Sequence, residues 1–227
     1  MASGQVVLNG AVNLLTPRQG MAQAGAAFTV TNPTPGTAIA YALQTGFSAT
    51  ANGLFSISNS EPTGGKNIIL DKLLLVQTAT AATGTLNMRL EANLESAVSA
   101  ITTLAAARTP VNLNSAASNS SIATVTSFAA GAATVPAAVG TRRLAAIASI
   151  PTGVTVAHDS FIFEFGGEGA GGKVGLTAAR ATDPAQMVTV VNPVVVGPQS
   201  TCFLNLWWVT AAANAPSFEF ALSWFEL

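Results

Sequence analysis

The glycine-rich segment 165–175, FGGEGAGGKVG, is the part of this sequence whose residue types and spacing most resemble a chemical site. From Gly167 it matches G-x-G-x-x-G and also the first seven positions of a phosphate-binding loop, ending at Lys173. Such loops bind phosphate through glycine backbones and the N-terminus of a following helix. Val174 stands where Ser or Thr must bind magnesium, and Pro184 leaves little room for that helix. We therefore expect a hairpin loop at the rim of the fold and assign it no ligand.

Acid–base, nucleophilic and metal chemistry have few other candidates. The single histidine, His158, is followed by Asp159 and Ser160, the residue types of a nucleophilic triad, but adjacent strand side chains point to opposite faces. Glu164 and Glu219 could lie on neighbouring strands, which leaves a carboxylate pair open without favouring one. One histidine and one cysteine cannot form the usual zinc sites. We therefore expect a protein that is not an enzyme and has no catalytic residue, metal or cofactor.

The charge content points to a structural role. Charged residues make up 8% of the chain, with a net charge of -1, against roughly 25% in an ordinary soluble domain. Interface cores are depleted in charge, and a net charge near zero favours association. The nine basic residues are scattered apart from the pair Arg142 and Arg143, so they form no footprint for a phosphate backbone. These features indicate a subunit of an assembly with no direct nucleic-acid partner.

We expect no membrane-spanning segment, secretory signal or disulfide bond. No stretch reaches 18 apolar residues, and the longest apolar runs are broken by Asp71 with Lys72 and by Pro151. The first ten residues, MASGQVVLNG, lack the basic start and the apolar core of a secretory signal. The single Cys202 lies in an apolar run and is expected to be a small buried hydrophobe.

Alternation of apolar and polar residues with a period of two is the dominant pattern along the chain. It is clearest in residues 85–94, 159–165 and 218–225. Turn-forming Asn-Pro, Pro-Gly, Asn-Gly and Gly-Pro pairs punctuate the rest. Further strands are expected at 26–31, 37–43, 54–58, 67–78, 122–128, 142–150, 186–191 and 201–210. The pattern predicts an all-β protein, an antiparallel β-sandwich of jelly-roll type with about 8–10 strands, in a single domain over 26–227.

Two segments leave alternatives open. Residues 1–25 form either an N-terminal arm that packs on a neighbouring subunit or a first strand followed by a loop. Leu94, Val98, Ile101 and Leu104 recur at helical spacing, which favours a short helix near 95–107. The alternative for that segment is an extended loop that runs to Ser121.

The tryptophan pair suggests an interaction surface. Trp207 and Trp208 are consecutive in an expected strand, so their rings must face opposite sides of the sheet. If Trp208 faces inward, Phe203, Trp207 and Val209 face outward, and Phe225 does so in the last strand. An apolar patch on a sheet with so few charges typically marks an interface, and we predict a subunit contact there. The alternatives are a cover formed by the arm or by 95–121, and a platform that binds sugars.

Several segments resemble a known group of proteins. They are NPTPGTAI near residue 32, GLFSISN at 53–59, GGKNIILDKLLL at 64–75, TPVNLN at 109–114, LTAARAT at 176–182 and WWVTAAANAPSFEFALSWFE at 207–226. Together they resemble virion structural proteins of tailed bacteriophages. The likeness spans most of the chain and is weakest in the first 25 residues and in 95–108.

The resemblance implies a function as well as a fold. Proteins of this kind are β-sandwiches that decorate or cement the capsid, commonly as homotrimers, so the implied partners are the major capsid protein and copies of this chain. The implied location is the capsid surface of the virion. The alternatives are a tail or host-attachment module, in which case a glycan would be the partner, and a jelly-roll shell subunit. No membrane partner is implied.

Overall fold

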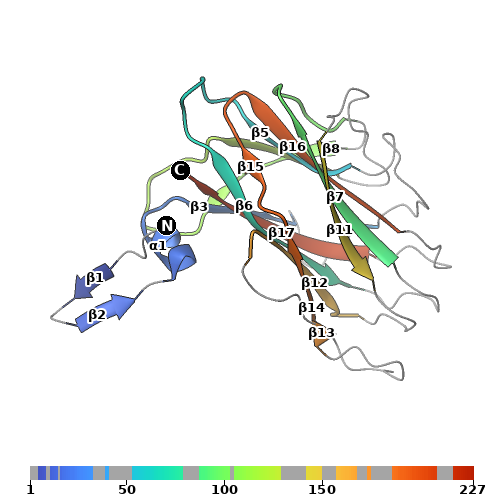
Figure 1. Cartoon of the computed structure of the whole chain (residues 1–227), viewed down its shortest axis with the longest axis horizontal. Helices are drawn as coiled ribbons and strands as arrows, with labels where there is room; N and C mark the ends of the chain where they lie inside the picture. The colour runs from blue at the N-terminus through green and yellow to red at the C-terminus, as the bar shows by residue number, and fades with distance from the viewer. Residues whose placement is uncertain are drawn as a thin grey trace.

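The structure is a computed structural model of the whole chain. It describes residues 5–8, 11–14, 16–32, 39–40, 53–78, 87–102, 105–128, 142–149, 157–167, 173–174, 186–208 and 217–227. Over these residues the fold is an all-β sandwich of two packed sheets, as the sequence predicts (Figure 1). Each of the eleven strands expected from the alternating pattern has a counterpart within the described residues.

The larger sheet forms one layer of the sandwich. Its order is β13-β14-β12-β6-β17-β3-β9, with β15 paired to β6 and β4 paired to β17. β12 and β14 run parallel, and the other strand pairs described in this sheet are antiparallel. The strands are β3 (Ala27–Thr31), β4 (Ile39–Ala40), β6 (Ile68–Gln77), β9 (Val111–Asn112), β12 (Ser160–Phe165), β13 (Lys173–Val174), β14 (Gln186–Val191), β15 (Val195–Val196) and β17 (Ser217–Glu226).

The smaller sheet has six strands in the order β11-β7-β16-β5-β10-β8. Its strand pairs are antiparallel throughout. The strands are β5 (Gly53–Asn59), β7 (Asn87–Glu95), β8 (Ala105–Arg108), β10 (Ala123–Phe128), β11 (Arg142–Ser149) and β16 (Ser200–Trp208).

The core lies between the two sheets. Period-two alternation sends one set of side chains from each strand into this layer, where burial of apolar surface stabilises the fold. Phe55 of β5 meets Phe220 of β17 across the layer, with ring centroids 4.7 Å apart in an edge-to-face arrangement. Trp224 is completely buried and stacks against Phe28 of the neighbouring β3. Cys202 is also completely buried, as expected.

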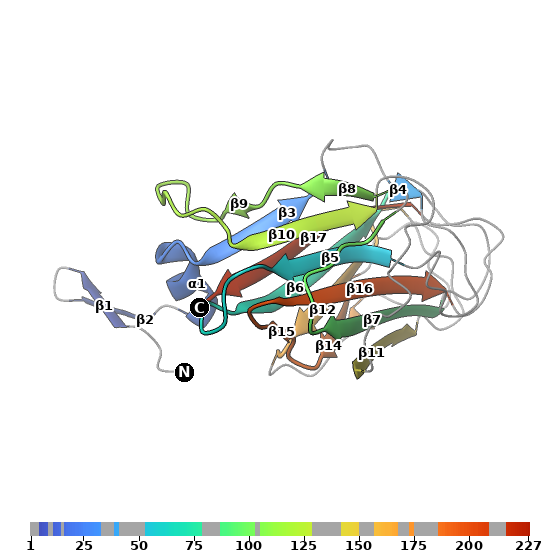
Figure 2. The same ribbon diagram turned by 90° about the horizontal axis from the view of Figure 1, so that it is seen from above.

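The N-terminal segment forms a hairpin and a short helix. β1 (Gln5–Leu8) and β2 (Ala11–Leu14) pair with each other, and α1 (Pro17–Gln23) follows. Both views show the hairpin standing away from the sandwich (Figures 1 and 2). α1 begins with a capping box, in which Thr16 accepts from the Gln19 amide and Gln19 accepts in return. Packing of this segment on a neighbouring subunit stays a prediction, and the structure adds a helix that alternation cannot predict.

The short helix expected near 95–107 is wrong for the residues that the structure describes. β7 continues to Glu95, residues 96–102 contain bends and no helix, and β8 begins at Ala105. β7 and β8 lie on opposite sides of the six-stranded sheet, so the connection must cross β16, β5 and β10 (Figure 2). A helix would bury several of the regularly spaced apolar residues. Of the three such residues that the structure describes, Ile101 is deeply buried, Leu94 is partly buried and Val98 is 49% exposed.

Candidate interaction surface

The side of β16 that was expected to face solvent is covered by another part of the same chain. Phe203 has no exposed surface and belongs to the hydrophobic core cluster. The prediction that Phe203 is exposed is therefore wrong. Asn205, on the same side of β16, is also completely buried. The connection 96–102 is bonded to Ser56, Ser58 and Thr201 on this face, which agrees with the covering alternative that the sequence left open.

Hydrogen bonds fix this connection to the sheet. Thr201 donates its hydroxyl to the carbonyl of Ala97 at 2.8 Å, and its Oγ1 accepts from the amide of Ser99 at 2.9 Å. Ser58 donates to the Ser99 carbonyl from the neighbouring strand. Ile101 donates its amide to Ser56 Oγ at 3.1 Å. These polar side chains satisfy backbone groups that would otherwise be buried without a partner.

The other residues of the expected patch are placed as follows. Trp207 lies in β16 in register with Arg89, but its side chain is outside the described part of the structure. Val209 lies outside the described residues. Phe225 is half-buried on the outer face of the nine-stranded sheet, where it lines a hollow beside α1. A subunit contact at Trp207, Val209 and Phe225 stays a prediction.

The expected carboxylate pair does not lie on neighbouring strands. Glu164 is in β12 and Glu219 is in β17, and β6 runs between them. Glu164 is in register with Lys72, whereas Glu219 is in register with Val76, four residues further along β6. Arg18 donates to Glu164 across 3.4 Å. Among the described residues, no group of three or more histidine, cysteine, aspartate or glutamate side chains could hold a metal ion.

The other chemical candidates occupy turns and a strand edge. His158 is exposed in a turn with a φ of 72°, and the neighbouring Asp159 is buried. Part of the glycine-rich segment, residues 168–172, lies outside the described residues. Beyond it, Lys173 and Val174 form the short strand β13, which pairs with β14. A phosphate-binding loop would need a helix at this point.

The outer face of the nine-stranded sheet carries an apolar row across four adjacent strands. Val188 of β14 is in register with Ile162 of β12, which is in register with Leu74 of β6, followed by Ala221 of β17. These four side chains are half-buried, whereas the residues that alternate with them are core residues apart from Thr189, which is half-buried as well. Val76 and Val190 extend the patch on either side of the row. We call these six residues the open face.

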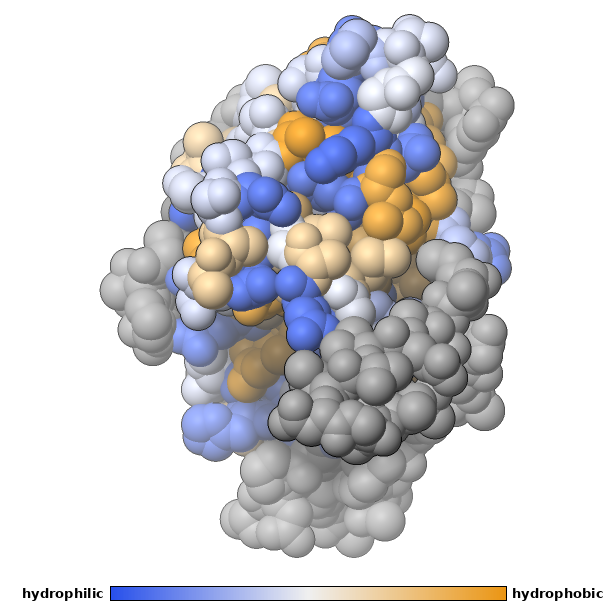
Figure 3. Space-filling model, turned by 90° about the vertical axis from the view of Figure 1, so that its left-hand side faces the viewer, coloured by the Kyte–Doolittle hydropathy of each residue, from blue (hydrophilic) through white to orange (hydrophobic). Residues whose placement is uncertain are grey.

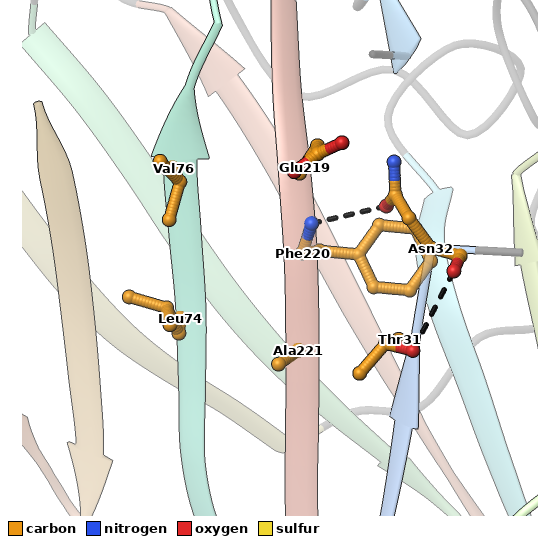
Figure 4. Close-up of a pocket in the computed structure, with 7 residues that line it drawn as sticks. All are labelled: Thr31, Asn32, Leu74, Val76, Glu219, Phe220 and Ala221. Carbon is orange, nitrogen blue, oxygen red and sulfur yellow. Dashed lines mark hydrogen bonds between the residues drawn. The ribbon is translucent and has the colours of Figure 1, made fainter. Parts of the chain in front are cut away.

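A hollow of about 330 Å³ lies at one side of the open face. Figure 4 shows Leu74 and Val76 on β6 beside Glu219 and Ala221 on β17, with Thr31 beyond them. At the far wall, the amide of Phe220 donates to Oδ1 of Asn32 at 3.0 Å. The exposed surface of the lining is mainly apolar, which suits shape-complementary contact more than acid–base chemistry.

Charged residues lie at the edge of the open face. β6 has an irregularity at which Lys72 pairs with Ser223 and Leu70 pairs with Trp224, so Asp71 is an extra residue. The Asp71 carboxylate accepts from Arg18 Nε at 2.6 Å and from Ser223 Oγ at 3.1 Å. Partial burial lowers the pKa of Arg18, but the opposite charge and hydrogen bond of Asp71 outweigh it, so the net shift is upward.

A second hollow, of about 300 Å³, lies where α1 meets the same sheet. Met21, Ile69, Phe225 and Leu227 contribute apolar lining, and Arg18 contributes a charged group. Leu227 is 44% exposed. Figure 3 views the molecule from the side on which α1 lies in Figure 1 and shows apolar patches between hydrophilic ones. α1 therefore covers one end of the outer face and leaves the open face uncovered by the helix.

The sequence analysis did not identify the open face or α1. The run IILDKLLLVQ of β6 is apolar on both sides of the strand, which is the signal that could have indicated two contact faces. The sequence Thr-Pro-Arg-Gln at 16–19, with a capping box and proline at the first helical position, could have indicated α1.

Comparisons with known protein families, with curated proteins and with solved structures found no match to this chain. Within the described residues, none of the helices is long and apolar enough to cross a membrane. The fold and the surface therefore define an all-β sandwich protein with an apolar sheet face, and no family is shown for it.

Proposed function

We propose that this chain is a virion structural protein that decorates or cements a bacteriophage capsid through subunit contacts and catalyses no reaction. The proposal rests on the sequence resemblance and on the low charge content, and the β-sandwich fold agrees with it. The proposed partners are the major capsid protein and copies of this chain, in a trimer on the capsid surface.

The observation that carries the proposal is the open face. A row of aliphatic side chains crosses four strands, and α1 covers only the neighbouring end of the same sheet. Contiguous apolar surface of this kind typically marks an interaction site. Burying it against another subunit would gain about 25 cal/mol for each Å² removed from water, without the cost of desolvating many charges.

The contact would work by shape and apolar burial. The half-buried positions on the open face are held in place by strands whose inward residues, such as Leu73, Leu75 and Phe163, are completely buried or nearly so. A rigid sheet presents its outer side chains with little loss of conformational entropy on binding, so more of the binding energy is retained.

A tail or host-attachment module that binds glycans is the second candidate. Sugar platforms use exposed aromatic rings, whereas the strongly exposed large apolar side chains of the described residues are Val98, Val111, Leu113, Val195 and Leu227. The open face is likewise aliphatic. These observations favour protein contact over glycan contact at this face, and they favour the capsid role over the attachment role.

The proposal is tested by adding purified protein to phage capsids from which the chain has been removed. Leu74→Lys places a charge at the centre of the open face, and Thr124→Lys places the same side chain at an exposed position on β10 in the other sheet. We expect the wild type and Thr124→Lys to co-sediment with capsids and Leu74→Lys to lose binding. Equal binding by both variants would show that the open face is not the contact.

A further inference from the structure

A group of polar side chains is buried on the outer face of the six-stranded sheet. Asn205 has no exposed surface, and Asn93 is 1% exposed. Within the described part of the chain, both polar atoms of the Asn205 carboxamide, Oδ1 of Asn93 and Oε2 of Glu95 are buried and have no hydrogen-bond partner. Folded proteins leave few buried polar atoms unsatisfied, and where such atoms gather they mark a bound ion or ordered water.

Strand register brings these side chains together. Glu91, Asn93 and Glu95 alternate along β7 and therefore lie on one side of it, whereas the core residue Ala92 lies on the other. Asn205 of the adjacent β16 is in register with Glu91 (Figure 2). Residues directly opposite each other have Cβ atoms about 5 Å apart, and diagonal neighbours such as Asn93 and Asn205 are about 7–8 Å apart. Oxygens of Glu91, Asn93 and Asn205 can therefore reach one common point.

This group offers oxygen ligands. Glu91, which is 6% exposed, supplies a carboxylate, and Asn93 and Asn205 supply carboxamide oxygens. A buried carboxylate is costly unless it is paired or coordinates a metal ion. Calcium takes about six to eight oxygen ligands at about 2.3–2.6 Å in a flexible geometry that water can complete, whereas magnesium demands a near-ideal octahedron. Three oxygens from two neighbouring strands therefore fit calcium better than magnesium.

Two arginines share this side of the sheet by register. Arg89 precedes Glu91 by two positions on β7, and Arg143 of the edge strand β11 is opposite Asn93. Their side chains lie outside the described part of the structure. A guanidinium is the other group that would neutralise Glu91, so the experiment must separate it from a metal ion.

We propose that Glu91, Asn93 and Asn205 bind one calcium ion between β7 and β16, with Glu95 at the edge of the site. The ion joins two adjacent strands on the side opposite the core and so stabilises the fold. The site is not a group of three acidic, histidine or cysteine side chains, because carboxamides supply two of its ligands. It belongs to the other sheet from the open face, so it stands or falls independently of the proposed function.

The test uses the purified full chain after treatment with a chelator. Isothermal titration calorimetry measures calcium binding, and thermal unfolding with and without calcium measures stabilisation. Glu91→Gln keeps the size of the side chain and removes its charge, and Asn205→Leu keeps a similar volume and removes an oxygen ligand. Glu61→Gln is the matched control, because Glu61 follows the Asn59 end of β5 and Asn205 is in register with Gly53 at the opposite end.

The proposal predicts that the wild type and Glu61→Gln bind one calcium ion per chain. For a Kd of about 0.1 mM, calcium at about 10 mM should raise the Tm of both by about 5–10 °C. Glu91→Gln and Asn205→Leu should bind at least about 10-fold more weakly, because each lacks one ligand. In chelator, Asn205→Leu should be at least as stable as the wild type, because leucine leaves no buried polar atom unsatisfied.

Other outcomes overturn the inference. If the wild type neither binds calcium nor gains stability from it, an arginine or buried water satisfies these groups. Equal calcium binding by Glu91→Gln and the wild type would place the ion elsewhere, and this variant decides the question alone if Asn205→Leu does not fold. An equal rise in Tm with sodium chloride at the same ionic strength would be a general salt effect and would also exclude the site.

Discussion

Arg18 of α1 donates a hydrogen bond from Nε to Oδ1 of Asp71 at 2.6 Å, and this contact joins the N-terminal segment to the bulge of β6. The carboxylate is presented on the outer face because Asp71 is the extra residue of the bulge. The same carboxylate accepts from Ser223, so its position is fixed from two sides. The contact therefore fixes α1 to the outer face of the nine-stranded sheet.

Replacement of Arg18 by alanine is expected to release α1 without unfolding the sandwich. The Arg18 side chain is 48% exposed, so solvent screening limits the ion pair to no more than about 1 kcal/mol. Amide hydrogen exchange over residues 17–26 should become faster, while the rest of the chain keeps its protection. Gln23→Ala, at an exposed position of the same helix, is the control. Unchanged exchange in Arg18→Ala would show that apolar packing alone holds the helix.

Thr201→Val is expected to loosen the connection that covers the six-stranded sheet. The substitution keeps the volume of the side chain but removes the bonds to the Ala97 carbonyl and the Ser99 amide. Losing these partly buried hydrogen bonds should lower the free energy of unfolding by about 0.5–1.5 kcal/mol in urea titrations. Thr124→Val, at an exposed site, should change it by less than about 0.5 kcal/mol. Equal stability of the two variants would contradict the role of this contact.

Phe203→Ala separates a core role from an interface role. Because Phe203 is completely buried within a single chain, its truncation should lower the free energy of unfolding by about 3–5 kcal/mol at a concentration at which the protein is monomeric. Chemical denaturation monitored by tryptophan fluorescence measures the loss. A variant that keeps full stability but loses self-association would restore the original expectation that this ring contacts a neighbour.

Cys202 makes stability depend on pH in alkaline solution. Complete burial raises the pKa of its thiol from the usual 9.0 to about 12. The unfolded thiol loses its proton first as pH rises, so the unfolded state is increasingly favoured above pH 9. The free energy of unfolding should fall by up to about 1.4 kcal/mol for each pH unit until the folded thiol also ionises.

The control for this pH dependence is Cys202→Ala, because other groups also titrate in alkaline solution. Urea titrations between pH 8 and about 11 should give a steeper loss of stability for the wild type than for the variant. Parallel curves for the two proteins would mean that the thiol is accessible to solvent in the folded state.

Alternation predicted the strands well because it reports how a strand is divided between two faces. In β17, for example, Phe218, Phe220, Leu222 and Trp224 are all buried on the core side. Alternation does not report what covers the other face. The polar side chains of Ser58 and Thr201 resemble solvent-facing residues, yet they bind a crossing segment from 41 to 104 positions away in sequence.

The misassigned helix has a similar cause. Leu94 lies near the end of β7, Val98 faces solvent and Ile101 enters the core, so their helical spacing arises from three unrelated environments. The open face could not be predicted because its apolar residues belong to strands that are distant in sequence and meet only through the register of β14, β12, β6 and β17. The function remains a proposal for the same reason, since no short motif encodes such a surface.

The number of copies of this chain in purified phage particles tests the central claim most directly. Quantitative mass spectrometry of virions, with the major capsid protein as internal standard, gives that number. A protein that decorates or cements the capsid should be present on the order of hundreds of copies in fixed ratio to the capsid protein, as icosahedral repetition requires. About a dozen copies would favour the tail, and absence of the chain from particles would contradict the account.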